Sequence, residues 1–429
     1  MTTKAAFYSF GCRTNKEEID AFAAQFRANG FEIIYDVKDF ASADFIVVNT
    51  CSVTLVSQQK NFRFVNNLKK KYPNAKIVVT GCLAQQLPKN FENVDFVLGN
   101  AEKGGIFDIV SKEKSGVFVG NPDRAELKIP KTIQPPNVCD RTRFSIKIQE
   151  GCDSFCSYCI VPYLRGKPKS ADFSEIVLLA QNAVDMGYNE IVLAGTHIGQ
   201  YQNGGKNFLD VAKKIVSMSD KIRLRLSSMN PNDCGEELFE FMLKNPQVCQ
   251  HLHVAVQSLS AQILTLMNRD YKAVENLFEN LQKYRKFMPQ LNLGGDFIVG
   301  FPSESEENFA ETKENIKKFG FNYGHVFTYS LRPQTPAADM KNQIPEKVKK
   351  QRSEILRNLF VLQKQNFAET QISTAHKIIV ETEGELSGIT QNYLRVRGEK
   401  NHSFRKNQVV DAVLRKYNSA QNFFEGEVG

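Results

Sequence analysis

The 429-residue sequence contains no tryptophan and no long apolar run. Its aromatic content comes largely from 32 phenylalanines, most of which fall in short apolar segments and are expected in the core. None of these segments reaches the about 18 residues that a membrane-spanning helix needs. The first residues, MTTKAAFYSFGC, also lack the apolar region and cleavage site of a secretory signal peptide. We therefore expect a cytoplasmic protein with no membrane partner.

A disulfide framework is not expected either. The nine cysteines are odd in number, and the cytoplasm keeps thiols reduced. Metal binding or catalysis is the better interpretation of whichever cysteines are functional. Charge is only weakly biased, because 55 basic and 47 acidic residues give a net charge of +8. Such an excess is compatible with an RNA partner without establishing one, and each basic stretch taken alone favours a solvated face.

Residues 1–125 alternate apolar runs with amphipathic segments. The runs KAAFYSFGC, ADFIVVNTC, AKIVVTGC and VDFVLGN predict strands, and residues 16–29 and 57–71 predict helices between them. This alternation predicts a doubly wound parallel sheet. Cys12, Cys51 and Cys82 each follow one of the first three strands, so their thiols are expected at one edge of the sheet. Three unrelated buried cysteines remain the alternative.

Residues 126–140, ELKIPKTIQPPNVCD, contain three prolines and predict a semi-rigid linker. Residues 141–368 then resume the strand–helix alternation about six times. The strand candidates are FSIKIQ, EIVLAG, IRLRLSS, HLHVAVQ, LNLGGDFIVG and GHVFTYS, with helices such as 170–186 and 303–319 between them. Six such units predict a partial (β/α)6 barrel whose site lies at the carboxyl ends of the strands.

A long amphipathic helix is predicted from Pro345, as its first helical residue, to about Phe367. Residues 369–429 change character, because KIIVETEG, ITQNYLRVRG and QVVDAVLRKY alternate with the two-residue period of strands. A small β-barrel is expected there. Its basic and acidic residues nearly balance, so its charge alone does not indicate RNA binding.

The stretch EGCDSFCSYCIVPY places Cys152, Cys156 and Cys159 directly after the first barrel strand. Structural zinc normally takes four protein ligands, so this spacing is one ligand short. A [4Fe–4S] cluster held by three cysteines instead keeps one iron open for a small molecule. A zinc site completed by Cys139 or a histidine is the alternative.

The motif CDSFCSYC resembles the signature of the radical S-adenosylmethionine superfamily. The segments SFGCRTN, NTCSV and GCLAQ resemble the amino-terminal domain of its methylthiotransferase branch, and the carboxy-terminal segment resembles a TRAM domain. The resemblance covers nearly the whole chain. It implies two [4Fe–4S] clusters, one on Cys152, Cys156 and Cys159 and an auxiliary one on Cys12, Cys51 and Cys82.

The resemblance also nominates contacts to S-adenosylmethionine. Tyr158 matches an aromatic position near the adenine, and LAGTHIG, RLRLSSMNP, VAVQS and GGDFIVGFPSE match cofactor-side strand ends. The residues carried over are Tyr158, Gly195, Thr196, His197, Arg225, Ser227, Gln257 and Asp296. Asp296 could instead pair with an arginine inside the barrel, and His197 could be a satisfied buried histidine.

The resemblance implies radical chemistry that places a methylthio group on an unactivated carbon. GCRTN and QEGCDSFCSYCIVPYLRGK resemble the subgroup that modifies C2 of N6-threonylcarbamoyladenosine at position 37 of tRNA, and the segment VFTYSLRPQTPA nominates Arg332 for the modified base. N6-isopentenyladenosine tRNA or a ribosomal-protein aspartate is an alternative substrate. A two-cluster electron-transfer protein is the alternative from another class.

The expected partners are tRNA and an electron donor such as flavodoxin or ferredoxin, and the expected state is a monomer. Two positions depart from the family pattern: Gln334 stands where glycine is usual, and Lys169 where arginine is frequent. Both departures concern RNA docking and substrate choice more than the radical chemistry. Cys139, Cys234 and Cys249 are expected to be structural.

Overall fold

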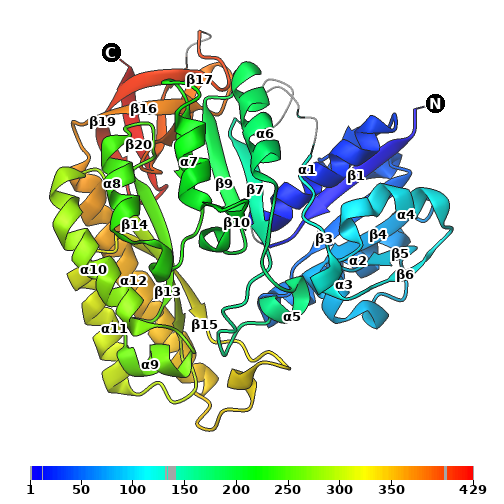
Figure 1. The fold of residues 1–429 in the computed structure, drawn as a ribbon, viewed down its shortest axis with the longest axis horizontal. Coiled ribbons are helices and arrows are strands. Elements are labelled where there is room, and N and C mark those ends of the chain that lie inside the picture. Colours follow the sequence, from blue (N-terminus) through cyan, green and yellow to red (C-terminus); the bar gives the residue numbers. More distant parts are fainter. Residues whose placement is uncertain (1, 12, 131–132, 134–141, 401–402, 429) are drawn as a thin grey trace.

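The computed structural model describes residues 2–11, 13–130, 133, 142–400 and 403–428. Cys12, Cys139 and most of the predicted linker lie outside these ranges. Figure 1 shows an amino-terminal unit beside a larger central unit, with a small carboxy-terminal barrel at one end of the latter. Among the described residues, no helix combines the length and the apolar character needed to cross a bilayer.

The amino-terminal unit is a doubly wound sheet of six parallel strands, as the alternation predicts. Their order is β2-β1-β3-β4-β5-β6, with bounds Glu32–Ile34, Lys4–Ser9, Phe45–Thr50, Lys76–Gly81, Phe96–Leu98 and Gly116–Phe118. Alternate strand residues pack on opposite faces. Helices α1 (Arg13–Ala28) and α4 (Ile106–Lys112) cover one face, and α2 (Leu55–Lys71) and α3 (Cys82–Gln86) the other. The sequence analysis missed β2 and β6, which have only three residues each.

The central unit is the expected partial barrel. One parallel group contains β7 (Phe144–Glu150), β9 (Glu190–Gly195) and β12 (Arg223–Leu226), and a second contains β13 (His251–Gln257), β14 (Asn292–Val299) and β15 (Tyr323–Thr328). Isolated bridges at Leu224–Val248 and Met229–Val254 connect the two groups. The two-residue strand β8 (Lys169–Ser170) pairs antiparallel with β7, and β10 (Gln202–Asn203) and β11 (Lys206–Asn207) form a small hairpin.

Helices surround the outside of the barrel and share its core with the strands (Figure 1). They are α6 (Phe173–Asp185), α7 (Phe208–Val216), α8 (Glu236–Lys244), α9 (Ala261–Leu266), α10 (Tyr271–Tyr284), α11 (Glu306–Phe319) and α12 (Glu346–Thr370). The short helix α5 (Val161–Arg165) instead packs against α3 of the amino-terminal unit. Caps explain why α6 and α11 begin three residues later than predicted: Asp172 and Ser305 accept hydrogen bonds from the first-turn amides. Pro345 is the N-cap of α12 rather than its first helical residue, which corrects the prediction.

The last five strands form a closed barrel in the order β16-β17-β18-β20-β19. Their bounds are Ala375–Val380, Glu385–Thr390, Arg395–Lys400, Phe423–Val428 and Val409–Asn418. This barrel covers the amino ends of the central strands, because Arg225 of β12 donates to the carbonyls of Thr390 and Gln391, and Asn292 of β14 donates to that of Asn392. The carboxy-terminal barrel therefore does not cover the carboxyl ends of the same strands, where ligands of such barrels bind.

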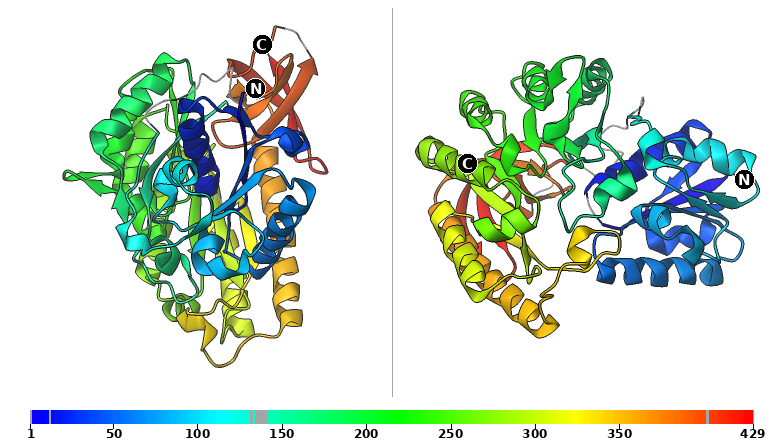
Figure 2. Two further views of the ribbon diagram at one scale, coloured as in Figure 1. Left: turned by 90° about the vertical axis from the view of Figure 1, so that its right-hand side faces the viewer. Right: turned by 60° about the horizontal axis from the view of Figure 1, so that its bottom comes forward.

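The amino-terminal unit lies along the open side of the partial barrel, where α1 contacts β7 and β9. The right-hand view of Figure 2 also shows the two units side by side, in agreement with the contacts between α1 and the barrel strands. The loops at the carboxyl ends of both parallel sheets consequently meet at one interface.

Candidate functional site

Two of the three predicted auxiliary ligands lie at the same edge of the amino-terminal sheet. Cys51 follows β3 and Cys82 begins α3 directly after β4, and both are buried. Gly11 has a φ of +87°, and a Cβ built on it would lie 2.5 Å from Sγ of Cys51. The backbone just before Cys12 therefore touches the Cys51 thiol, which only glycine permits. Cys12 itself is outside the described residues.

Polar side chains connect the three loops at this edge. Nδ2 of Asn15 donates to the carbonyls of Phe10, at 2.9 Å, and Thr50, at 3.0 Å. Oγ1 of Thr50 donates to the carbonyl of Thr80, at 2.6 Å, and accepts from the amide of Ala84. The residues flanking the cysteines are thus fixed by buried hydrogen bonds.

The second group of thiols lies in the loop after β7. Gly151 has a φ of +81° and lies against the backbone of residues 166 and 167, and the amide of Cys152 donates to the carbonyl of Gly166. The amide of Cys159 donates to the carbonyl of Cys156, which closes a turn. Ser157 donates through Oγ to the carbonyl of Leu266. The loop is therefore held from both sides, and the thiols of Cys152 and Cys156 lie near enough to Cys159 to act on it electrostatically.

The electrostatics of this loop suit a metal cluster. Burial, with the nearby Cys156 and Cys152 sulfurs, raises the pKa of Cys159 to about 12. Three thiolates this close repel one another unless a cation lies between them. Nη1 of Arg269 lies 3.5 Å from Sγ of Cys156. The donor set therefore fits a three-cysteine iron–sulfur cluster.

His197 has two partners. Its Nδ1 lies 3.8 Å from Sγ of Cys152 and its Nε2 lies 2.9 Å from Oδ2 of Asp233. Burial opposes the charged imidazolium, but Asp233 and Cys152 together raise the pKa of His197 to about 9. The ring therefore places a cation beside a predicted cluster ligand.

Cys82 lies at the interface between the two units, close to the loop that carries Cys159. Cys82 packs with Ile160 and Leu164, which directly follow the Cys159 loop, in one small apolar cluster. On the other side of the interface, Arg332 follows β15, is buried, and donates to the carbonyl of Val53 and to Oε1 of Gln58. Arg332 therefore joins the barrel to the loop that carries Cys51.

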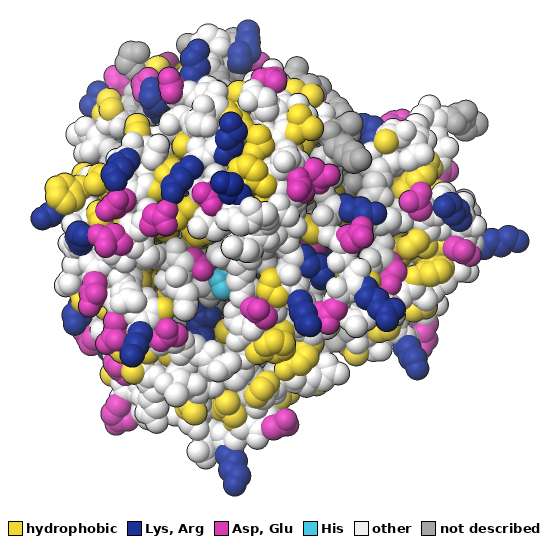
Figure 3. Space-filling view, viewed as in Figure 1, with side chains coloured by type: hydrophobic (Ala, Val, Ile, Leu, Met, Phe, Trp, Pro, Cys, Tyr) yellow, Lys and Arg dark blue, Asp and Glu magenta, His cyan; other side chains and the backbone are white. Residues whose placement is uncertain are grey.

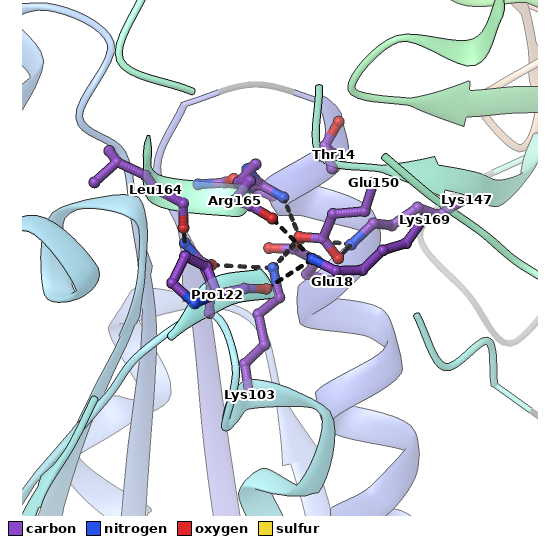
Figure 4. A network of polar contacts seen from close by, with 12 residues as sticks. Thr14, Glu18, Lys103, Pro122, Lys147, Glu150, Leu164, Arg165 and Lys169 are labelled. Atoms are coloured by element: carbon purple, nitrogen blue, oxygen red, sulfur yellow. Dashed lines mark hydrogen bonds and ion pairs between the residues drawn. The ribbon is translucent and has the colours of Figure 1, made fainter. Parts of the chain in front are cut away.

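A buried ionic network fills the interface between the two cysteine loops (Figure 4). Glu18 of α1 accepts from Lys103, Lys147 and Arg165 at 2.7–2.8 Å. Glu150, two residues before Cys152, binds the same three cations. These cations hold the pKa of Glu150 at about 2 despite burial. Two carboxylates and three cations thus connect the domains through charges withdrawn from water.

Most residues predicted to contact S-adenosylmethionine lie at the carboxyl edge of the barrel. Gly195 ends β9, and Thr196 and Ser227 follow β9 and β12 with buried hydroxyls that have no hydrogen-bond partner among the described residues. Gln257 ends β13 with a φ of +68°, a strained conformation that tends to occur at functional sites. Tyr158 lies in the cysteine loop, and burial raises the pKa of its phenol well above the usual value. Because buried hydroxyls normally have a hydrogen-bond partner, the two without one at this edge indicate space for a polar ligand.

Two predicted cofactor contacts are elsewhere. Arg225 points to the amino end of the barrel, where it binds Glu190 and the carboxy-terminal barrel. Asp296 lies inside the barrel, where Oδ1 is 3.1 Å from Nε2 of His253 and 3.3 Å from Nδ1 of His325. The motif around Arg225 identifies a strand, but it does not say toward which end of the barrel the arginine side chain extends.

Other residues at the site were missed by the sequence analysis. Arg269 and Asp233 contact the cysteine loop directly or through His197, and Glu18 and Lys103 belong to the ionic network. Arg269, Asp233 and Lys103 lie more than twenty residues from any predicted cluster ligand, and Glu18, although only six residues after Cys12, falls in no recognisable motif. Only the fold brings them to the cysteines.

Comparisons with known proteins agree with this geometry. A family model described as "Uncharacterized protein family UPF0004" matches residues 4–99, and the "Radical SAM superfamily" model matches residues 146–316. Among solved structures, the radical S-adenosylmethionine methyltransferase TsrM from Kitasatospora setae superposes with a TM-score of 0.58 at 14% identity. That match covers 79% of this chain and 77% of TsrM, and it indicates a shared fold. The central unit is therefore a radical SAM domain.

Full-length relatives define the family more narrowly. The threonylcarbamoyladenosine tRNA methylthiotransferase MtaB of Bacillus subtilis (strain 168) is 34% identical over 91% of this chain and 89% of its own length. The protein of the same name from Aquifex aeolicus (strain VF5) is 33% identical over 92% and 97%. A tRNA-2-methylthio-N(6)-dimethylallyladenosine synthase of Bordetella pertussis is also 33% identical, over 90% and 89%. The chain belongs to the radical SAM tRNA methylthiotransferase family.

Proposed function

We propose that this protein adds a methylthio group to C2 of N6-threonylcarbamoyladenosine at position 37 of tRNA. The observation that carries the proposal is the packing of Cys82 against Ile160 and Leu164. It brings the edge that bears Cys51 and Cys82 against the loop that bears Cys152, Cys156 and Cys159. Two groups of thiols that face one interface suit a reaction with a radical source and a sulfur source.

The six cysteines would hold two [4Fe–4S] clusters, one on Cys12, Cys51 and Cys82 and one on Cys152, Cys156 and Cys159. With S-adenosylmethionine, these groups supply a carbon-centred radical and a sulfur donor when bound. Radical chemistry suits the substrate, because an aromatic C–H has no acidity that a general base could use. The chain's own contribution is to bind and orient.

The cofactor contacts that we retain in the proposal lie at the carboxyl edge of the barrel. Thr196 and Ser227 would give their unpartnered hydroxyls to polar atoms of S-adenosylmethionine. Gly195 has no space for a side chain, because an added Cβ would lie 2.9 Å from Ile198. Tyr158, His197 and Gln257 complete this group.

The tRNA would bind mainly through its phosphates, with the modified adenosine exposed in an unpaired loop. On the face seen in Figure 3, basic and acidic side chains are interspersed, which favours many separate phosphate contacts over one basic patch. We assign RNA docking to the carboxy-terminal barrel, residues 369–429, and reduction to a flavodoxin or ferredoxin. We further propose a monomer located in the cytoplasm.

Arg332 enters this proposal with a second role beside the predicted base contact. Two of its nitrogens bind the Cys51 loop, and Nη2 is buried without a hydrogen-bond partner among the described residues. Nη2 therefore remains available to a ligand of the auxiliary cysteine group or to the substrate.

Mass spectrometry of tRNA nucleosides from a deletion strain tests the substrate. We expect loss of 2-methylthio-N6-threonylcarbamoyladenosine and accumulation of its unmodified precursor, with rescue by the wild-type gene and none by a Cys156→Ala gene. Loss of the methylthio group from N6-isopentenyladenosine, or from a ribosomal-protein aspartate, would reassign the substrate. An electron-transfer protein instead predicts no 5′-deoxyadenosine from the purified protein with reductant and S-adenosylmethionine.

A further inference from the structure

Three side chains on adjacent strands of the barrel form a cluster that has no role in the function proposed above. His253 of β13, Asp296 of β14 and His325 of β15 point into the barrel, and Asp296 and His325 are register partners. Oδ1 of Asp296 lies 3.1 Å from Nε2 of His253 and 3.3 Å from Nδ1 of His325. All three potential ligand atoms lie within 4.8 Å of one another.

A neighbouring tyrosine fixes the orientation of His253. The hydroxyl of Tyr323 lies 3.1 Å from Nδ1 of His253 and 2.7 Å from Nε2 of His251. Its ring lies so close to Gly294 that any Cβ at that position would overlap it. Because Nδ1 of His253 is engaged by the hydroxyl, Nε2 is left to face Asp296. Histidines that bind metals usually have such a partner on the second ring nitrogen.

We propose that His253, Asp296 and His325 bind one divalent transition-metal ion of the Zn²⁺ or Fe²⁺ type. Two imidazoles and a carboxylate are ligands that such ions accept. With metal–ligand bonds of about 2.0–2.1 Å, tetrahedral ligand atoms lie about 3.3 Å apart. Both distances from Asp296 already match this spacing, and the two histidine nitrogens lie within 4.8 Å of each other, so a small movement of the imidazoles completes the site.

Three protein ligands leave at least one coordination position open. The side chain of His325 is 61% exposed, whereas those of His253 and Asp296 are 11% and 22% exposed. The open position therefore faces the accessible side of the cluster, where water or an oxygen atom of a bound molecule can occupy it. The site is independent of the proposed function, because no cysteine belongs to it. In this proposal Asp296 is a metal ligand and not the contact to S-adenosylmethionine that the sequence resemblance implied.

Equilibrium dialysis against Zn²⁺, followed by elemental analysis, tests the site. The full chain is used anaerobically with both iron–sulfur clusters loaded, so that the cysteines are occupied, and its iron content is measured in parallel. We expect one zinc per chain without loss of iron. The variants His253→Ala and Asp296→Asn should lose this zinc. Tyr323→Phe, which removes only the supporting hydroxyl, should weaken zinc binding about tenfold.

His376→Gln is the matched control, because His376 lies in the carboxy-terminal barrel and faces Thr374. It should bind zinc like the wild type. Circular dichroism and the thermal midpoint identify any variant that fails to fold. If His253→Ala or Asp296→Asn does so, Tyr323→Phe still tests the site, because this substitution preserves the aromatic ring and removes only the hydroxyl. Absence of bound zinc from the wild type overturns the proposal and indicates a metal-free hydrogen-bonded cluster. Equal zinc binding by wild type, Asp296→Asn and Tyr323→Phe overturns it as well.

Discussion

Arg165 donates through Nη2 to Oδ1 of Asn15 across the domain interface at 2.7 Å. Asn15 also holds the carbonyl of Thr50, next to Cys51, while Arg165 ends the helix that follows the Cys159 loop. Through Nη1, Arg165 binds both Glu18 and Glu150. The guanidinium of Arg165 therefore contacts residues that hold the backbone next to Cys51 and residues that lie next to the Cys152 loop. Because the spacing of the groups decides whether sulfur can reach the substrate, these contacts bear on function as well as stability.

The first prediction concerns this guanidinium. Arg165→Met removes one of three cations from two buried carboxylates, and breaking a buried ion pair typically costs about 3–5 kcal/mol. We expect a lower thermal midpoint and lower iron retention after anaerobic loading. Lys167→Met is the control, because Lys167 lies two residues away with an exposed side chain. Equal thermal midpoints in both variants would show that the network is not a stabilising contact.

The main features of the fold could be predicted from the sequence because local patterns determine them. Continuous apolar runs separated by amphipathic helices indicated parallel strands, and the two-residue period of the last sixty residues indicated the small barrel. The cysteines at strand ends followed from the same logic, since parallel strands end at one edge. The edge strands β2 and β6 were missed because three residues are too few to show a recognisable hydrophobic pattern.

Long-range contacts could not be predicted in the same way. Nothing near Arg269 or Asp233 in the sequence indicates proximity to Cys152 or Cys156, because both contacts depend on how the barrel closes. Arg225 was assigned to the cofactor from its motif, yet its direction along the strand places it with Glu190. Gln334, where the sequence resemblance led us to expect glycine, has a φ of +74°, a conformation that glycine adopts without strain.

The second prediction is a count of iron. Anaerobically loaded wild type should contain about eight irons per chain, and Cys82→Ala or Cys156→Ala about four, because each change removes a ligand from one cluster. Cys249→Ala is the control and should retain about eight, since its buried thiol lies beside Glu190 under the carboxy-terminal barrel. Mössbauer spectra and chemical iron analysis give the count. A wild type with about four irons would contradict the auxiliary cluster.

The third prediction concerns Glu190, which lies fully buried between Arg223 and Arg225 under the carboxy-terminal barrel. Burial favours its neutral form, but the two arginines hold the pKa of Glu190 far below its usual 4.5. A lowered folded-state pKa stabilises the fold above the unfolded-state pKa. This stabilisation is therefore lost progressively as the pH falls below about 4.5.

Glu190→Gln leaves two buried guanidinium groups without a counter-charge, at a cost of about 3–5 kcal/mol. Above pH 5 the variant should unfold at a lower temperature than the wild type, and the difference should shrink as the pH falls. Thermal unfolding between pH 3 and 7 measures this, with Glu240→Gln as an exposed control that leaves the midpoint nearly unchanged. A pH-independent difference would argue against the ionic explanation.

The fourth prediction concerns Arg332 and the auxiliary cluster. Burial lowers the pKa of its guanidinium, and a charge on Cys51 acts in the opposite direction, so the two groups are electrostatically coupled. A nearby cation stabilises the more negative, reduced state of a cluster held by Cys51. Arg332→Gln should therefore make the auxiliary reduction potential more negative, by roughly 60 mV if one charge-assisted hydrogen bond of about 1.4 kcal/mol is lost.

Potentiometry followed by electron paramagnetic resonance separates the two clusters. It is best performed in a Cys156→Ala background, where only the auxiliary cluster remains. Arg357→Gln is the control, since Arg357 lies on α12 and donates to the carbonyl of Val326 on the outside of the barrel. A purely structural Arg332 would reduce iron content without moving the potential of the cluster that remains. A shifted potential at unchanged iron content therefore assigns Arg332 an electrostatic role that the fold alone does not require.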